Sequence, residues 1–219
     1  MPRPTIEDLR SLILTFEDMK KDRRYPIHSA SPGCPDGGET IRENWVSSQF
    51  SNTEGPTKAY ALGCEFVVMD DDTRQVGHIM LLDFDGKVVF DELIRPRGQI
   101  KTVLAKHNSQ TPIRFIEHSW FSLKDIQDRL FKIVSAEDII IGHTVYKDLQ
   151  ALEWKHPKIV DTVKIFSYIH PQESPSLDFL TLYFLGSEYV DKISRFSGPV
   201  VDARAVLDLT KFEIKCWNL

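Results

Sequence analysis

The chain has 219 residues, of which 42% are hydrophobic and 27% charged, and its formal net charge is −5. This composition is ordinary for a globular protein with a full core, and it excludes RNA binding that relies on overall positive charge. No apolar run approaches the roughly 20 residues that cross a bilayer, and three widely spaced cysteines favour reduced thiols and an intracellular location.

The first 57 residues differ in composition from the rest. Apolar residues at helical spacing over residues 5–22 predict one amphipathic helix with Thr5 as its N-cap. Residues 23–57 are rich in Pro, Gly, Ser and Asn, which predicts an irregular arm. We therefore expect an N-terminal extension over residues 1–57 and a globular domain over residues 58–219. The extension is also predicted to dock, either onto the body of this chain or onto a protein partner.

From residue 58 onward, segments with strand and helix patterns alternate. Three strand-like segments come first, with a turn at Asp85-Gly86 between the second and third: AYALGCEFVVM, VGHIMLLDFDG and KVVFDELIRP. A helix capped by Ser122 follows, then a strand, turn and helix in DIIIGHTVYKDLQALEW and a short apolar segment in KIVDTVKIF. SLDFLTLYFLG predicts a helix that ends at Gly186, and Pro199 begins the last helix. This order predicts an α/β fold with a mixed sheet.

Three acidic residues stand where strands end or helices begin: Glu65, Asp148 and Asp202. Phosphodiester hydrolysis by two metal ions needs several carboxylates that converge from different elements, because hard divalent cations prefer oxygen ligands. Spacing alone does not establish convergence. Solvated or capping carboxylates are the simpler interpretation of three isolated acids.

The residues around these acids favour the catalytic interpretation. Four motifs occur in the order and approximate spacing of the DEDD 3′-to-5′ exonucleases: ALGCEFV, IIIGHTVYKDLQAL with KHPKIVDT, SLDFLTLYFLG, and VVDARAVLDL. Within that superfamily the chain most resembles the RNA exonuclease branch, over about Tyr60 to Leu209. The resemblance implies a ribonuclease-H-like fold, with a mixed central sheet flanked by helices, and a site for two Mg²⁺ or Mn²⁺ ions. It also implies an Asp-x-Glu pair, two further Asp ligands and a general-base His five residues before the last Asp.

This chain meets that pattern only in part. Glu65, Asp148 and Asp202 match metal-binding catalytic positions, whereas Gly63 replaces the first Asp and Ser197 replaces the His. Glycine offers no side-chain oxygen, and a serine hydroxyl does not take a proton from water near neutral pH as an imidazole does. We therefore expect an incomplete metal site and a pseudo-exonuclease that binds RNA or a protein. The alternative is a weakly active, metal-dependent 3′-to-5′ exoribonuclease.

Other residues could fill the vacant roles or bind RNA. We expect His143 to be structural, Asp70, Asp71 and Asp72 to be exposed in a turn, and Cys64 to point away from Glu65 into the core. His118 and His170 are alternative bases, and Asp161 is either a site residue or a helix cap. Trp120 and Trp154 are expected in the core, and stacking on RNA bases is the alternative for them. Two basic clusters are solvated faces or phosphate sites: Lys20, Lys21, Arg23 and Arg24, and Arg95, Arg97, Lys101 and Lys106.

Overall fold

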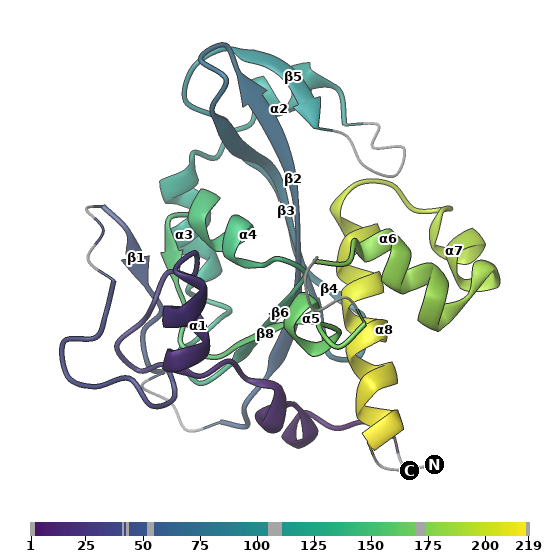
Figure 1. Cartoon of the computed structure of the whole chain (residues 1–219). Coiled ribbons are helices and arrows are strands. Elements are labelled where there is room, and N and C mark those ends of the chain that lie inside the picture. Colours follow the sequence, from purple (N-terminus) through teal and green to yellow (C-terminus); the bar gives the residue numbers. More distant parts are fainter. Residues whose placement is uncertain are drawn as a thin grey trace.

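The computed structural model describes residues 3–40, 42, 44–51, 55–104, 111–169 and 174–217, and a mixed sheet lies at its centre (Figure 1). Strand order is β4-β3-β2-β6-β8, and β5 also pairs with β2. The β2–β3 and β3–β4 pairs are antiparallel, whereas β6 lies parallel to both β2 and β8. The predicted mixed sheet is therefore confirmed. The strands are β2 (Ala59–Met69), β3 (Arg74–Asp83), β4 (Val88–Leu93), β5 (Ile100–Leu104), β6 (Ile139–Gly142) and β8 (Ile159–Asp161).

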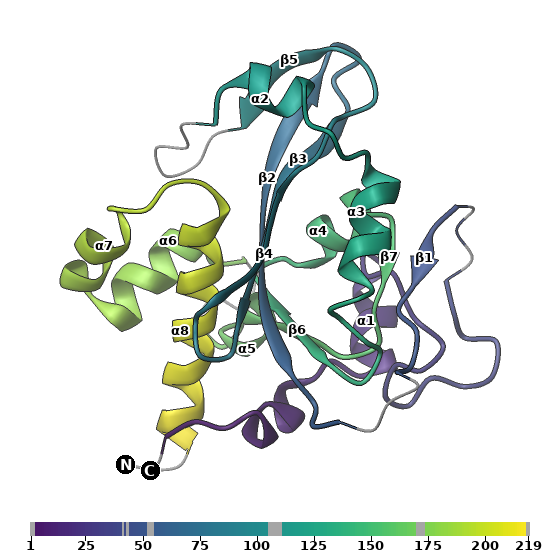
Figure 2. The same ribbon diagram turned by 180° about the vertical axis from the view of Figure 1, so that it is seen from behind.

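Helices cover both faces of this sheet (Figures 1 and 2). One face packs against α1 (Phe16–Asp22), α3 (Leu123–Leu130) and α4 (Tyr146–Ala151). The other packs against α6 (Leu177–Leu180), the π-helical turn η2 (Thr181–Leu185), α7 (Ser187–Ile193) and α8 (Pro199–Trp217). The remaining short elements are η1 (Glu7–Leu12), β1 (Val46–Ser47), α2 (Ile113–Glu117), β7 (Trp154–Lys155) and α5 (Thr162–Ile165). No helix in the described ranges is long and apolar enough to cross a membrane.

Local sequence signals explain several boundaries. Ser122 caps α3 by accepting the backbone N–H of Asp125, whose side chain bonds back to the Ser122 N–H. Gly186, with φ of +83°, ends η2 as predicted, because glycine enters the left-handed region without steric cost. Pro199 is the first residue of α8, where its missing N–H leaves no hydrogen bond unmade. All three described cysteines are free thiols.

The prediction of one helix over residues 5–22 is wrong, because η1 and α1 are separate. Ile13 is extended, with ψ of 128°, and the Leu14 N–H donates to the carbonyl of Ile159 at 2.8 Å. Thr15, rather than Thr5, then starts α1 in a capping box with Asp18. The apolar spacing reflects burial on two different faces, since Leu9 lies in one core cluster and Met19 in the other.

The N-terminal extension is packed onto the rest of the chain. Strand β1 pairs in parallel with β7, and Tyr25 is buried beside the helices of the central sheet. Ser48 is buried and accepts a hydrogen bond of 2.8 Å from the indole N–H of Trp154. These contacts occupy the inner side of the extension, so a protein partner at residues 1–57 would have to bind its exposed side. That partner stays a prediction.

Candidate active site

A cavity opens at an interruption in the sheet beside β2. Strand β6 pairs with the start of β2, over residues 59–61, and β5 pairs with its end, over residues 66–69, on the same edge. Within the described chain, residues 62–65 have no strand partner on that edge, and a cavity of about 670 Å³ lies there. Its lining comprises Leu62, Gly63, Cys64, Glu65, Phe66, Arg74, Leu104, His143, Thr144, Lys147, Asp148, Gln150, Ala151, Leu177, Gly198, Pro199, Asp202 and Val206.

The structure places all three predicted acids around this cavity. Glu65 comes from β2, Asp148 from α4 on one face of the sheet, and Asp202 from the first turn of α8 on the other face. The gap in the sheet lets helices from opposite faces reach the same space, which explains how residues 137 positions apart meet. Gly63 also lines the cavity, whereas Ser197 is exposed and lies outside the lining.

Helix α8 packs directly onto the backbone of Gly63. A Cβ atom added at this glycine would lie 2.2 Å from the carbonyl oxygen of Pro199 and 3.3 Å from Cβ of Ala203. The first of these distances is far below van der Waals contact, and backbone cannot rotate away as a side chain can. Any side chain at position 63, including the aspartate that the resemblance implies, therefore requires the start of α8 to move.

Glu65 faces His78, which we did not identify from the sequence. The two residues are direct partners across the β2–β3 pair, and the Nδ1 atom of His78 lies 3.9 Å from Oε2 of Glu65. The other ring nitrogen, Nε2, lies 2.6 Å from Oδ1 of Asp91 on β4. The hairpin register places His78 here, but a β-bulge after Glu65 shifts that register, so simple counting from the turn misses it.

Cys64 does not simply point into the core. It packs partly against the cluster on the α3–α4 face, but it also lines the cavity and its thiol bonds to the carboxylate of Asp148. Burial raises the pKa of the Cys64 thiol well above its ordinary value, and the neighbouring Asp148 raises that pKa further. The thiol of the metal-free protein therefore stays protonated near neutral pH.

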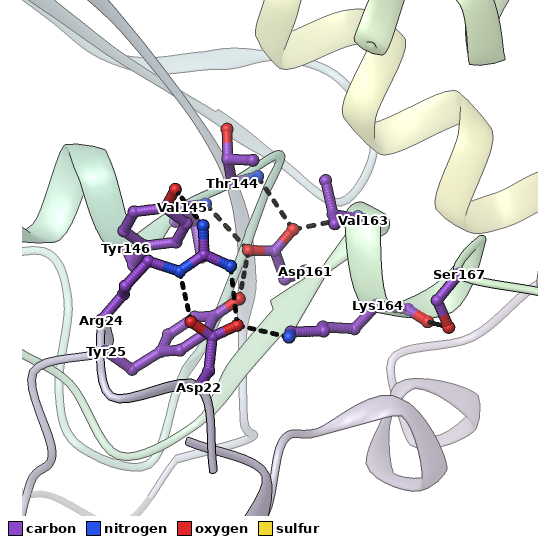
Figure 3. A network of polar contacts seen from close by, with 10 residues as sticks. All are labelled: Asp22, Arg24, Tyr25, Thr144, Val145, Tyr146, Asp161, Val163, Lys164 and Ser167. Carbon is purple, nitrogen blue, oxygen red and sulfur yellow. Dashed lines mark hydrogen bonds and ion pairs between the residues drawn. The ribbon is translucent and has the colours of Figure 1, made fainter. Parts of the chain in front are cut away.

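Asp161 lies apart from the cavity lining and is a capping residue. Its buried carboxylate accepts backbone N–H groups from Thr144 and Val145 at 2.9 Å each and from Val163 at 3.0 Å (Figure 3). The Tyr25 hydroxyl donates a fourth hydrogen bond at 2.6 Å. Burial raises the pKa of Asp161, while these hydrogen bonds act in the opposite direction. The capping interpretation is correct.

Among the other histidines singled out from the sequence, the described ones are His143, at the cavity, and His118, outside its lining. His143 lines the cavity, but its Nδ1 atom lies 2.8 Å from the hydroxyl of Thr162, in keeping with a structural role. His118 is exposed outside the lining, with Nδ1 2.8 Å from the carbonyl of Arg114. His170 lies outside the described residues.

The predicted burial is correct for one tryptophan and for the three consecutive aspartates, but wrong for the other tryptophan. Trp154 is fully buried as predicted, and Asp70, Asp71 and Asp72 are exposed in a turn. The core prediction for Trp120 is wrong, because its side chain is 89% exposed. Its neighbour Ser119 takes the inward position and donates a hydrogen bond to the carbonyl of Leu93.

The positive charges at the cavity come from outside the two predicted basic clusters. Arg74 from β3 and Lys147 from α4 line the cavity. In the first cluster, Arg24 pairs with Asp22 and donates a hydrogen bond of 2.7 Å to the Tyr146 hydroxyl. In the second, Arg97 and Lys101 form ion pairs with acidic neighbours, Arg95 donates to the carbonyl of Ser119, and Lys106 lies outside the described residues.

The metal-binding capacity of these residues falls short of the two-ion set that the resemblance implies. In the described part of the chain, no group of three or more His, Cys, Asp or Glu side chains is arranged to hold a metal ion. Position 63 contributes no oxygen, and the space beside it contains the Pro199 carbonyl. The residues present therefore do not fit a pair of ions held as in the family pattern.

Sequence relatives carry the names of RNA nucleases. RNA exonuclease 1 of Saccharomyces cerevisiae is 32% identical over 191 residues, which cover 87% of this chain and 32% of the relative. Small RNA degrading nuclease 2 of Arabidopsis thaliana is 29% identical over 180 residues, which cover 76% of this chain and 38% of the relative. The chain thus spans between about a quarter and a half of the length of the curated relatives it matches. No family profile matches it.

Solved structures show the same fold at lower identity. The Saccharomyces cerevisiae Pan2 module, solved in complex with AAGGAA RNA, superposes with a TM-score of 0.62 at 14% identity. The match covers 81% of this chain and 33% of the Pan2 chain. The central mixed sheet with helices on both faces is accordingly a ribonuclease-H-like fold. With sequence relatives named as RNA exonucleases and a fold shared with the Pan2 module, the chain is similar to RNA exonucleases, consistent with the DEDD exonuclease superfamily.

Proposed function

We propose that this chain is an RNA-exonuclease-like domain that binds single-stranded RNA at the β2 cavity and has lost efficient hydrolysis. The observation that carries the proposal is the contact between Gly63 and Pro199. At the position where the resemblance implies the first metal-binding carboxylate, an added Cβ atom would lie 2.2 Å from the Pro199 carbonyl oxygen. This close approach supports the proposal, because the packing of α8 leaves no space there for an aspartate side chain.

The expected loss of rate is large. A positioned general base is worth about 10²- to 10⁴-fold, and a catalytic metal contributes several kcal/mol of charge stabilisation. Ser197, at the position of the expected base, is exposed and stands outside the cavity lining. The two losses need not add, but either one is sufficient to make turnover slow.

Binding of RNA is supported by the chemistry of the cavity walls. Arg74 and Lys147 supply positive charge for phosphates, and Phe66 and Leu104 supply apolar surface for bases. The Pan2 neighbour, which shares the fold, was solved with RNA. Three carboxylates in the same cavity repel phosphate and only two basic side chains attract it, so we expect modest affinity that falls moderately with salt.

One observation favours a second function, a weak metal-dependent 3′-to-5′ exoribonuclease. Glu65, Asp148 and Asp202 still surround one cavity although they come from three separate elements. If a single ion bound between them, slow trimming of RNA ends would follow. This function predicts activity that depends on Asp148.

A labelled single-stranded RNA tests both functions together. We expect saturable binding in an anisotropy titration, weakened by Arg74→Ala with Lys147→Ala, and no trimming in Mg²⁺ or Mn²⁺. Lys132→Ala is the control, because Lys132 is exposed outside the cavity lining. Trimming that disappears in Asp148→Ala would establish the enzyme instead. Absence of both binding and trimming would reject the RNA role and leave the protein-partner prediction.

A further inference from the structure

Buried polar atoms without partners face one another between β2 and β3. Glu65 is only 5% exposed, yet neither of its carboxylate oxygens has a hydrogen-bond partner among the described residues. The Nδ1 atom of His78 is likewise buried without a hydrogen-bond partner within that set, and its contact with Oε2 of Glu65 is a long ion pair of 3.9 Å. Burying a carboxylate that accepts no hydrogen bond is unfavourable, and a group bound between these atoms would satisfy both of them.

The histidine is held in the orientation of a metal ligand. Asp91 lies 2.6 Å from Nε2 of His78, which fixes the ring and leaves Nδ1 directed toward Glu65. A carboxylate on the far nitrogen of a ligating imidazole is the usual outer-shell arrangement of metal-binding histidines. Two ligand atoms that are each about 2.1 Å from one tetrahedral cation lie about 3.4 Å apart, so the two atoms, 3.9 Å apart, would need to approach each other by about 0.5 Å.

The gap between these residues borders the cavity. Glu65 and Gly198 both line the cavity, and a Cβ atom added at Gly198 would lie 3.8 Å from Nδ1 of His78. The segment before α8 therefore covers the imidazole nitrogen, while the carboxylate reaches the open side. Two protein donors leave positions that water or a phosphate oxygen from the cavity can fill.

We infer that Glu65 and His78 form a binding site for one divalent transition-metal cation, with Asp91 as the residue that orients the imidazole. The mixed nitrogen and oxygen donors favour Zn²⁺ over Mg²⁺, which prefers oxygen ligands alone. The site needs neither an aspartate at position 63 nor a histidine at position 197. It goes beyond the proposed function, because the cation binds whether or not RNA is present.

Calorimetric titration of the RNA-free protein with Zn²⁺ and with Mg²⁺ tests this inference. We expect one saturable Zn²⁺ site and much weaker Mg²⁺ binding. Asp91→Asn should weaken Zn²⁺ binding by about 10- to 100-fold, as loss of an outer-shell partner does, and His78→Ala should weaken it further. His118→Ala is the control for binding to an exposed histidine outside the site.

Folding of each variant is checked by thermal unfolding without metal, and the partly exposed Asp91 keeps the test valid if His78→Ala does not fold. The inference is overturned if Zn²⁺ does not bind, if Mg²⁺ binds as tightly, or if Asp91→Asn and His78→Ala bind Zn²⁺ like the wild type. Because no RNA is used, failure here is separate from failure of the proposed RNA binding.

Discussion

Two buried carboxylates of the central sheet differ in their hydrogen bonding. Asp161, at the end of β8, accepts hydrogen bonds from three backbone N–H groups and from the Tyr25 hydroxyl. Glu65, on β2, has no hydrogen-bond partner among the described residues. Buried polar groups in folded proteins nearly always have hydrogen-bond partners. We therefore interpret Asp161 as a structural carboxylate and Glu65 as a ligand-binding one.

The polar groups around Asp161 form a network of hydrogen bonds and ion pairs between the N-terminal extension and the rest of the chain. Tyr25 and Arg24 come from the N-terminal extension, and Arg24 pairs with Asp22, which also pairs with Lys164 of α5 (Figure 3). The hydrogen bond from Arg24, and then that from Lys164, lowers the pKa of Asp22 to about 2. Burial and the nearby Asp161 raise the pKa of Tyr25, so its hydroxyl stays a donor. This network joins the extension to the domain.

Removing Asp161 should have the largest effect on stability. Asp161→Ala leaves buried backbone N–H groups and a tyrosine hydroxyl without an acceptor, so we expect a loss of about 3 to 5 kcal/mol in the free energy of unfolding. Urea unfolding measures this loss. Asp191→Ala, at an exposed position on α7, is the control and should change stability by less than about 0.5 kcal/mol. A loss below about 1 kcal/mol for Asp161→Ala would remove the distinction between the two carboxylates.

Much of the fold could be predicted because its signals are local. The strand-like segment AYALGCEFVVM matches β2 at both ends, and the cap at Ser122 and the stop at Gly186 lie where the sequence places them. The break between η1 and α1 could not be predicted, because it depends on a hydrogen bond from Leu14 to Ile159, far away in the chain. The spacing of apolar residues indicates which residues are buried, but not against which face of the sheet they pack.

The candidate site could be predicted only at the level of single residues. Glu65, Asp148 and Asp202 came from motif resemblance, and their meeting at one cavity depends on a gap in the sheet that no local pattern shows. His78 was missed because a β-bulge sets its position opposite Glu65. The glycine at position 63 was visible in the sequence, whereas the Pro199 carbonyl beside it was not.

A side chain at position 63 should have an intermediate effect. Gly63→Ala introduces a Cβ atom 2.2 Å from the Pro199 carbonyl, and overpacking of this kind costs about 1 to 3 kcal/mol. Gly63→Asp should cost at least as much, since it adds a buried charge, and with Ser197→His it should not restore fast RNA hydrolysis. Urea unfolding and the RNA assay measure the two effects. A neutral Gly63→Ala variant would show that α8 moves away easily and that the vacancy is not built into the packing.

The smallest effect is expected at Glu65. Glu65→Gln removes a buried charge that has no hydrogen-bond partner among the described residues, so metal-free stability should change by less than about 1 kcal/mol or rise slightly. Saturating Zn²⁺ should then raise the unfolding free energy of the wild type and leave that of the variant nearly unchanged, because only a ligand of the folded state stabilises it. Urea unfolding without Zn²⁺ measures the metal-free stability, and the increase on adding Zn²⁺ measures the stabilisation by the bound ion. If Glu65→Gln instead loses as much metal-free stability as Asp161→Ala, Glu65 is a structural carboxylate like Asp161. The proposed difference between a structural carboxylate and a cation-binding one would then be wrong.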